Sequence, residues 1–174
     1  MFSCPFSGTT GLSKGVKLSH KNIVSNAMMI NSDTGTGQLT YPAVGSHQDV
    51  IPCVLPYFHI YGLTCTLLSK LAHGCKLVTL PRFHPDTYLN ALEIHQSSVL
   101  YLVPPISKFS HILTQSEMFN TSLSFSVIFM NNCNKIEPKH TKAIKYVMSG
   151  AAPIGPHDAD RFNKIAPNAQ FFQG

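Results

Sequence analysis

Short apolar runs alternate along this chain with stretches of helical periodicity. A strand buried on both faces has the pattern of such a run, whereas a helix repeats its apolar positions every three or four residues. The runs that we expect to form strands are residues 49–55, 75–80, 98–103, 143–148 and 170–172. Because helical stretches with short connections separate these runs, the pattern predicts an α/β fold with a mainly parallel sheet and helices on both faces.

Local signals mark the ends of several helices. Ser19 is a suitable N-cap, Pro85 suits the first turn of a helix, and Gly74 suits a helix end. The helices that we expect are 19–32, 59–72, 85–96, 104–115 and one that begins near residue 156. Residues 34–47 are rich in Gly, Ser and Thr, which predicts a surface loop.

The strongest chemical signal lies in the nine residues from Ser7 to Gly15. They contain three glycines, four hydroxyl side chains and one lysine. Glycines let backbone N–H groups approach oxygen anions closely, hydroxyls add donors, and the lysine adds a positive charge. This composition predicts a loop that holds a polyphosphate.

The same loop also partly fits three other patterns. The nucleoside-triphosphatase motif G-x-x-x-x-G-K-[ST] is absent, because Gly15 follows Lys14 instead of preceding it. The segment 11–15 does fit the G-x-S-x-G elbow of hydrolases, with Ser13 as nucleophile, but that elbow needs a strand before it and a helix after it. Pro5 interrupts the preceding segment, and residues 16–18 alternate like a short strand, so the elbow is disfavoured. A plain turn between two strands stays open.

Composition is less informative about function than the motifs are. The 174 residues, 44% hydrophobic and 12% charged, are sufficient for one domain with a packed core. A net charge of +5 suits an anionic ligand but decides little. The five cysteines include no C-x-x-C pair, which favours reduced thiols, an intracellular protein and no structural zinc. No leader and no membrane-length apolar run is apparent, so we expect a soluble protein.

Several blocks of the chain, taken in order, are similar to one known family. The loop residues 5–16 with 18–22 resemble the signature loop of the AMP-forming acyl-CoA synthetases, the adenylate-forming ligases that include coumarate-CoA ligases and firefly luciferase. The further matching blocks are residues 54–62, 103–105, 148–153 and 173–174. The resemblance covers most of the chain except residues 118–140, which we expect to be an insertion, with a faulty gene model favoured over a real surface excursion.

The resemblance implies a fold, a reaction and a set of ligands. The chain would be an incomplete portion of the family's large N-terminal domain, with the C-terminal domain absent. The complete enzyme would use ATP to activate a carboxylic acid as an acyl-adenylate, with Mg²⁺ on the phosphates, and would then transfer the acyl group to CoA. No nucleic acid is implied as a partner.

The resemblance also assigns roles to residues. His59 would be the catalytic histidine beside the substrate carboxylate. The acyl pocket would include Tyr57, Phe58 and Tyr61. The nucleotide-binding residues would be Ser7, Gly8, Thr9, Thr10, Gly11, Lys14, Gly150, Ala151, Ala152, Gln173 and Gly174. No residue of this chain is assigned to a metal.

The chain departs from the family pattern in two places. Within the loop, relatives usually have two serines before the first glycine and a proline before the lysine, whereas this chain has Phe6 before Ser7 and Ser13 before Lys14. One phosphate donor is therefore in doubt, and a one-residue deletion would shift the frame of the loop. The chain stops at Gly174, before the magnesium carboxylate, the ribose-binding aspartate and the adenylation lysine of relatives. We therefore expect this chain alone to be inactive, and the alternative is a non-catalytic nucleotide-binding or interaction fragment. The acid, the oligomeric state and the choice between peroxisome and cytoplasm stay open.

Overall fold

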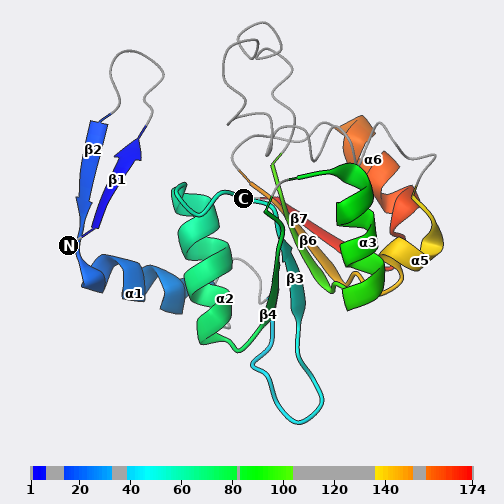
Figure 1. Cartoon of the computed structure of the whole chain (residues 1–174), viewed down its shortest axis with the longest axis horizontal. Coiled ribbons are helices and arrows are strands. Elements are labelled where there is room, and N and C mark those ends of the chain that lie inside the picture. Colours follow the sequence, from blue (N-terminus) through cyan, green and yellow to red (C-terminus); the bar gives the residue numbers. More distant parts are fainter. Residues whose placement is uncertain are drawn as a thin grey trace, which may run out of the picture.

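The computed structural model describes residues 2–6, 14–32, 39–81, 83–103, 136–150 and 156–173. Its elements in chain order are β1 Phe2–Phe6, β2 Lys14–Leu18, α1 His20–Ile30, β3 Val50–Cys53, the π-helix η1 Tyr61–Leu68, α2 Ser69–Ala72, β4 Lys76–Thr79, α3 Pro85–His95, β5 Val99–Leu102, α5 Pro138–Thr141, β6 Tyr146–Ser149, α6 Pro156–Ile165 and β7 Gln170–Gln173 (Figure 1).

Parallel strands form the centre of the molecule. Strand β3 pairs in parallel with β4, and β6 pairs in parallel with β5 on one side and β7 on the other. Strands β3 and β5 are joined through Ser98, whose N–H donates to the Val50 carbonyl at 2.9 Å and whose hydroxyl accepts from the Val50 N–H at 3.0 Å. The predicted mainly parallel sheet is confirmed.

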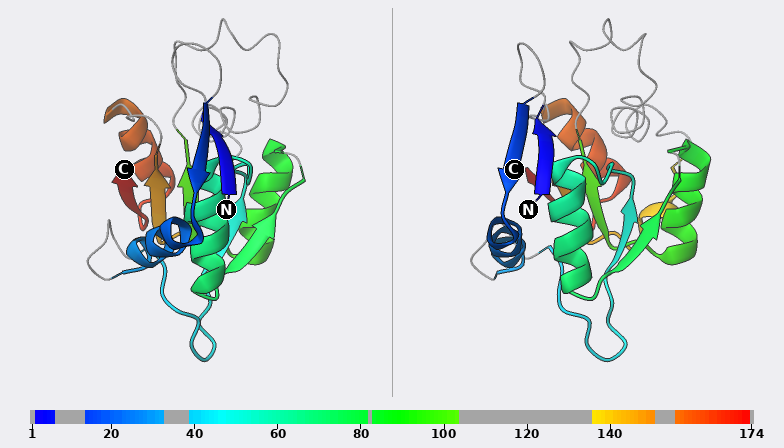
Figure 2. Two further views of the ribbon diagram at one scale, coloured as in Figure 1. Left: turned by 90° about the vertical axis from the view of Figure 1, so that its left-hand side faces the viewer. Right: turned by 60° about the vertical axis from the view of Figure 1, so that its left-hand side comes forward.

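Alternate residues of the strands face two separate cores. In β5, Leu100 and Leu102 pack toward α3 and α6, whereas Val99 and Tyr101 pack toward the face on which η1 lies. The first core consists of Tyr88, Leu89, Leu92, Leu100, Leu102, Ile144, Val147, Phe162 and Ala166. The second consists of Leu39, Ile51, Cys53, Leu55, Cys75, Val99 and Tyr101. Helices therefore lie on both faces of the sheet, as the pattern predicted (Figure 2).

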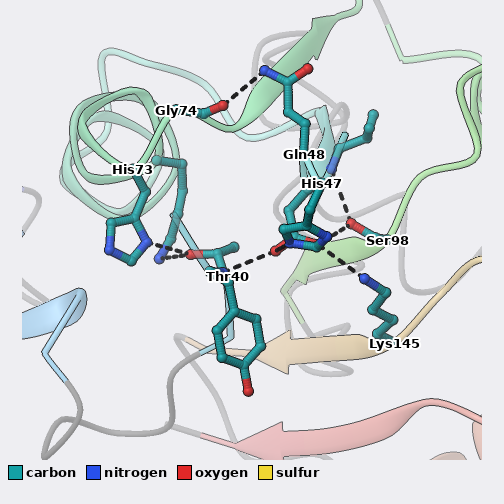
Figure 3. A network of polar contacts seen from close by, with 11 residues as sticks. Thr40, His47, Gln48, His73, Gly74, Ser98 and Lys145 are labelled. Atoms are coloured by element: carbon teal, nitrogen blue, oxygen red, sulfur yellow. Dashed lines mark hydrogen bonds and ion pairs between the residues drawn. The ribbon is translucent and has the colours of Figure 1, made fainter. Parts of the chain in front are cut away.

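A buried carboxylate joins the strands at the edge where they begin. Asp49, 1% exposed and just before β3, accepts hydrogen bonds from the Tyr41 N–H at 3.0 Å and from the Ser98 hydroxyl at 2.8 Å. It also forms ion pairs with His47 at 3.5 Å and with Lys145 at 3.6 Å (Figure 3). Because Ser98 precedes β5 and Lys145 precedes β6, this cluster connects three strands.

A hairpin precedes the sheet. Strand β1 pairs antiparallel with β2, and Pro5 lies opposite Gly15. The expectation that Pro5 interrupts this segment was wrong, since Pro5 lies within β1, and proline is tolerated in edge strands. The strand β2 directly follows residues 7–13, so the strand-to-helix setting that a hydrolase elbow at Ser13 requires is not present.

Helix boundaries largely follow the sequence signals. The Ser19 hydroxyl accepts from the Asn22 N–H at 3.1 Å, which confirms Ser19 as the N-cap of α1. Helix α3 begins at Pro85 and ends before Gln96, whose φ of 49° gives a left-handed C-cap. The predicted strand at 143–148 instead occupies Tyr146–Ser149, because α5 and its following turn occupy the preceding residues. The predicted helix at 104–115 lies outside the described residues.

The predicted helix from residue 59 to 72 forms, but most of it has π-helical geometry. Hydroxyl side chains satisfy carbonyls four residues earlier: Thr64 donates to Ile60 at 2.8 Å, and Ser69 donates to Cys65 at 2.7 Å. Thr66 donates in the same way to Gly62. Such back-bonding supplies donors to carbonyls in a helix whose backbone bonds run to the fifth residue.

Candidate functional site

A cavity of about 760 Å³ opens between α1, η1 and the end of β6. Its lining residues are Leu18, Asn22, Ile23, Asn26, Met29, His59, Ile60, Tyr61, Thr64, Cys65, Met148 and Gly150. Met148 and Gly150 lie at the carboxyl end of β6, which is where open parallel sheets bind their ligands. The volume is in the range of small-molecule sites.

His59 lies at the turn between β3 and η1. Its backbone N–H donates to the Pro56 carbonyl at 3.1 Å, and its own carbonyl accepts from the Leu63 N–H at 2.9 Å. The side-chain Nδ1 accepts from the Tyr61 N–H at 3.2 Å. The neutral ring therefore carries its proton on Nε2, which is the atom able to donate to a ligand.

Close packing at Gly62 fixes this turn. A Cβ atom built on Gly62 would overlap the carbonyl group of Pro56, the same carbonyl that holds the His59 N–H. Only glycine lets η1 approach the turn so closely. The backbone of His59 is thus held from both sides.

Tyr61 and Gly150 both line the cavity and contact each other there. A Cβ on Gly150 would lie 3.1 Å from the phenol oxygen of Tyr61, so the absence of a side chain leaves room for the ring. Burial raises the pKa of Tyr61, and the phenol remains neutral. Its hydroxyl is buried and has no hydrogen-bond partner in the described part of the chain, which leaves a donor for a bound molecule.

The other residues singled out from sequence lie in different places. Tyr57 is half-buried against the second core, while Phe58 is 67% exposed and does not line the cavity. Lys14 begins β2 opposite Phe6, and Gln173 ends β7. Ser7, Gly8, Thr9, Thr10, Gly11, Ala151, Ala152 and Gly174 lie outside the described residues.

Two stretches connect these outlying residues to the cavity. Leu18, which ends β2, lines it, so the hairpin leads from the glycine-rich loop to the cavity wall. Gly150 lines it too, and its N–H donates to the Leu102 carbonyl at 3.1 Å. The cavity thus brings together His59, Tyr61 and Gly150 of the predicted residues.

The polar lining contributed by α1 was not anticipated from the sequence. Asn22, Asn26 and Met29 are spaced four and three residues apart, which places them on one face of the helix. This spacing could have indicated a common face. Because two of the three residues are polar, however, the face does not have the apolar pattern by which a packed helix face is recognised. Thr64 and Cys65 were also not predicted as site residues, because the apolar run around them is typical of a buried helix.

Two further properties concern the described residues as a whole. Among them, no three His, Cys, Asp or Glu side chains cluster closely enough to bind a metal ion. Over the same ranges, none of the helices has the length and apolar character needed to cross a membrane.

Comparison with known proteins decides the family. The family model described as AMP-binding enzyme matches residues 5–174. The chain belongs to the AMP-binding enzyme family. The resemblance of its sequence blocks to adenylate-forming ligases is thereby confirmed.

Relatives of this AMP-binding chain include plant ligases. The chain is 31% identical to 4-coumarate–CoA ligase 3 of Arabidopsis thaliana over 172 residues, which are 98% of this chain and 26% of that protein. It is 33% identical to 4-coumarate–CoA ligase 1 of the same plant over 170 residues, covering 97% of this chain and 26% of that protein. The chain therefore spans about a quarter of the length of these relatives.

Solved structures of adenylate-forming ligases share the fold. ATP-bound MatB from Rhodopseudomonas palustris superposes with a TM-score of 0.66 at 25% identity, over 99% of this chain and 28% of that one. A malonyl-CoA ligase bound to methylmalonyl-CoA and AMP superposes with a TM-score of 0.69 at 20% identity, over 97% of this chain and 32% of that one. These matches confirm the predicted fold as a part of the ligases' N-terminal domain.

Proposed function

We propose that this chain is a portion of an acyl-CoA synthetase, which uses ATP to convert a carboxylic acid into an acyl-adenylate and then transfers the acyl group to CoA. The observation that carries the proposal is the cavity in which His59, Tyr61 and Gly150 meet, in a chain of the AMP-binding enzyme family. The similarity to two 4-coumarate–CoA ligases supports the acid–thiol ligase reaction.

The proposed reaction has two steps. A carboxylate oxygen attacks the α-phosphorus of ATP, and the bond to the bridging oxygen breaks as pyrophosphate leaves. The thiol of CoA then attacks the acyl carbon and displaces AMP. Both steps develop charge that the protein must stabilise, and fixed donors in a site with little water do this best.

His59 and Tyr61 would serve the acid. The Nε2–H of His59 would donate to a carboxylate oxygen, since Nδ1 is already engaged by the Tyr61 N–H. The neutral Tyr61 phenol, whose hydroxyl has no hydrogen-bond partner in the described part of the chain, would be a second donor. The neighbouring Gly150 has no side chain, which lets the Tyr61 ring lie against its backbone and form this part of the cavity wall.

The glycine-rich loop would serve the phosphates. Ser7, Thr9, Thr10 and Lys14 are the donors expected to hold the β- and γ-phosphates. Lys14 and Leu18 are the two ends of β2, so one strand joins this loop to the cavity wall. No carboxylate lines the cavity among the described residues, so the proposal assigns no magnesium ligand to them.

Carboxylate-dependent ATP–pyrophosphate exchange tests this function. The complete protein would be assayed with 4-coumarate and with a panel of aromatic and fatty acids. We expect Lys14→Ala to slow exchange about 10- to 100-fold, the scale of one charged hydrogen bond. We also expect His59→Ala to slow it, whereas Lys17→Ala, which removes an exposed lysine of the same strand, should leave it unchanged.

Two results would contradict the proposal. Absence of exchange in the native protein with every acid would overturn the function. Unchanged exchange in both the Lys14 and His59 variants would overturn the site assignment while leaving the function in place.

A second candidate is nucleotide binding without turnover by the chain of 174 residues itself. It is favoured by the lack of a carboxylate in the described cavity lining, since Mg²⁺ binds carboxylate oxygens. Calorimetric titration of this chain with ATP, combined with the exchange assay, separates the two candidates. Binding with no exchange would favour the second, and exchange by this chain would exclude it.

A further inference from the structure

Helix α1 forms one wall of the cavity and yet buries none of its residues. Val24, Met28 and Met29 are 57%, 69% and 60% exposed. Apolar burial normally holds a short helix in place, because eleven residues are marginal as an isolated helix. Its other apolar side chains, Ile23, Ala27 and Ile30, are only half-buried, so apolar packing holds α1 weakly and polar contacts become more important.

Polar contacts at the C-terminal end of α1 supply such a connection. Asn31, the C-cap residue, donates from Nδ2 to the Ser69 carbonyl at 2.8 Å. Its Oδ1 accepts from Lys70 Nζ at 3.0 Å. Ser69 and Lys70 belong to α2, which continues directly from η1. One side chain of α1 is thus bonded twice to the helix that forms the opposite cavity wall.

Lys70 is itself anchored. Its Nζ also donates to the Thr40 hydroxyl at 3.0 Å, and the Thr40 oxygen lies 3.1 Å from Nδ1 of His73 (Figure 3). Lys70 and Thr40 are each 1% exposed. The donor that reaches Asn31 therefore has little freedom to move.

The chemistry of this contact is unusual for a lysine. Burial lowers the pKa of Lys70, although the thiols of Cys75 and Cys65 and the carboxylate of Asp49 act in the opposite direction. Its two hydrogen-bond acceptors are a neutral amide and a hydroxyl. A buried cation whose hydrogen bonds go only to neutral groups is a costly way to gain stability, whereas polar buried contacts do fix one arrangement of packed helices.

We propose that Lys70 and Asn31 are positioning residues that hold α1 against η1 and α2 and thereby set the shape of the acid-binding cavity. Asn22, Ile23 and Asn26 on α1 line the cavity opposite Tyr61 and Cys65 on η1. A shift of α1 would change the space between these two walls. For its kinetic consequence, the inference rests on the proposed function.

Hydrogen exchange of the 174-residue chain tests the positioning role without any substrate. The variants are Lys70→Met and Asn31→Leu, which keep the side-chain volume, and their combination, with Lys76→Met on the exposed start of β4 as the control. In the single variants we expect the amides of α1 to exchange at least about tenfold faster, the equivalent of one lost hydrogen bond, while β5 and β6 are unchanged. The control should match the native chain.

The double variant separates positioning from stability. Lys70→Met leaves Asn31 Oδ1 without its donor, and Asn31→Leu removes one of the two acceptors of Lys70, whereas the double variant removes both members of the pair, so its loss of global stability should be smaller than the sum of the two single losses. Exchange in α1 should remain fast, because the connection is still missing. Equal acceleration in every element, or α1 protection that recovers with stability, would overturn the proposal.

The kinetic arm uses the complete protein with 4-coumarate. Lys70→Met should raise the KM for the acid about tenfold and leave the KM for ATP and kcat within about twofold, since only one wall of the cavity is displaced. A uniform loss of kcat would overturn the positioning role. If the native protein shows no activity, the proposed function fails, and the exchange experiment still decides the role of Lys70 and Asn31.

Discussion

At the scale of single residues, Asp49 illustrates how a buried charge is kept in this fold. Burial alone would raise its pKa, but the hydrogen bonds from Tyr41 and Ser98, with the charges of Lys145 and His47, hold the pKa below the usual value. The ionised carboxylate therefore stabilises the folded chain. It does so at the edge of the sheet opposite the cavity, so its contribution can be measured apart from ligand binding.

Neutralising this charge should destabilise the fold. Asp49→Asn leaves Lys145 and His47 without their partner, and we expect a loss of about 3 kcal/mol in the free energy of unfolding. Because the folded pKa lies below the unfolded value near 3.9, the stabilisation is complete above that value and is lost as the pH falls through the folded pKa. Urea unfolding between pH 3 and 7 measures both effects.

The control for Asp49 is Asp160→Asn, which removes an exposed carboxylate from α6. It should unfold like the native chain at neutral pH. A native-like acid dependence in the Asp49 variant would contradict the assigned role of the carboxylate.

Gly62 controls the approach of η1 to the turn that carries His59. In Gly62→Ala the added methyl group would overlap the Pro56 carbonyl, so we expect a loss of about 2 kcal/mol and a displaced His59. Thermal unfolding measures the loss, and the nuclear magnetic resonance shifts of the His59 ring report the displacement. Gly45→Asn is the matched control, since nothing lies within 4 Å of Gly45 and asparagine tolerates its φ of +60°. Equal effects in the two variants would contradict the packing argument.

At the scale of elements, hydroxyl side chains in and next to η1 support a π-helical form that the hydrophobic pattern does not predict. Thr64, Thr66 and Ser69 each donate to a carbonyl four residues earlier. Apolar periodicity over so few turns does not separate helices with different backbone bonding. The helix was therefore predicted, but its π-helical form was not.

Removing one of these hydroxyls should weaken the element. Thr66→Val keeps the shape of a side chain that is 1% exposed and deletes its donor to Gly62. We expect a loss of about 1 kcal/mol, the net value of one hydrogen bond, from denaturant unfolding. Thr79→Val on exposed β4 should change little. A gain in stability at position 66 would show that the hydroxyl does not support η1.

The strands and α3 were predictable for physical reasons. A strand buried on both faces, such as the one within residues 98–103, is apolar at successive positions and is therefore recognisable as one run. Pro85 fixes the first turn of α3. Strand β1 was missed because proline is a poor strand former, and its pairing with β2 depends on a partner beyond the segment itself. Pairing partners are a tertiary property, which local pattern does not contain.

The site was predictable only in part. His59, Tyr61 and Gly150 were identified because their blocks resemble a family, not because their spacing revealed a cavity. Asn22 and Asn26 enter it only through the placement of α1 against η1, which depends on contacts such as that between Asn31 and Lys70.

At the scale of the whole molecule, the described parallel strands pair in two groups, β3 with β4 and β5 with β6 and β7, and β4 and β7 each have one paired edge. Among the described residues, β4 pairs with β3 alone and β7 with β6 alone. A strand that presents unpaired backbone groups is a template for another chain. The edge at β7 also carries Phe171 and Phe172, both partly buried, so it combines backbone donors with apolar side chains.

We expect the 174-residue chain to self-associate through β7. Gln170→Lys combined with Gln173→Lys places charges at two exposed positions of that strand and should lower association at least about tenfold. Sedimentation velocity over a range of concentrations measures the change. Asn163→Lys on the exposed surface of α6 controls for the added charge. Equal association in both variants would place the contact elsewhere.

The π-helical form of η1 also bears on how positions in related chains are matched. A helix that closes its bonds at the fifth residue accommodates one more residue per bonded ring than an α-helix of the same extent. If a related chain has one residue more or fewer in this helix, its backbone N–H groups can bond to a different carbonyl, and the flanking β3 and α2 need not move. Equivalent residues across this helix are therefore those with the same neighbours: a ring in contact with Gly150, or an amine bonded to Asn31.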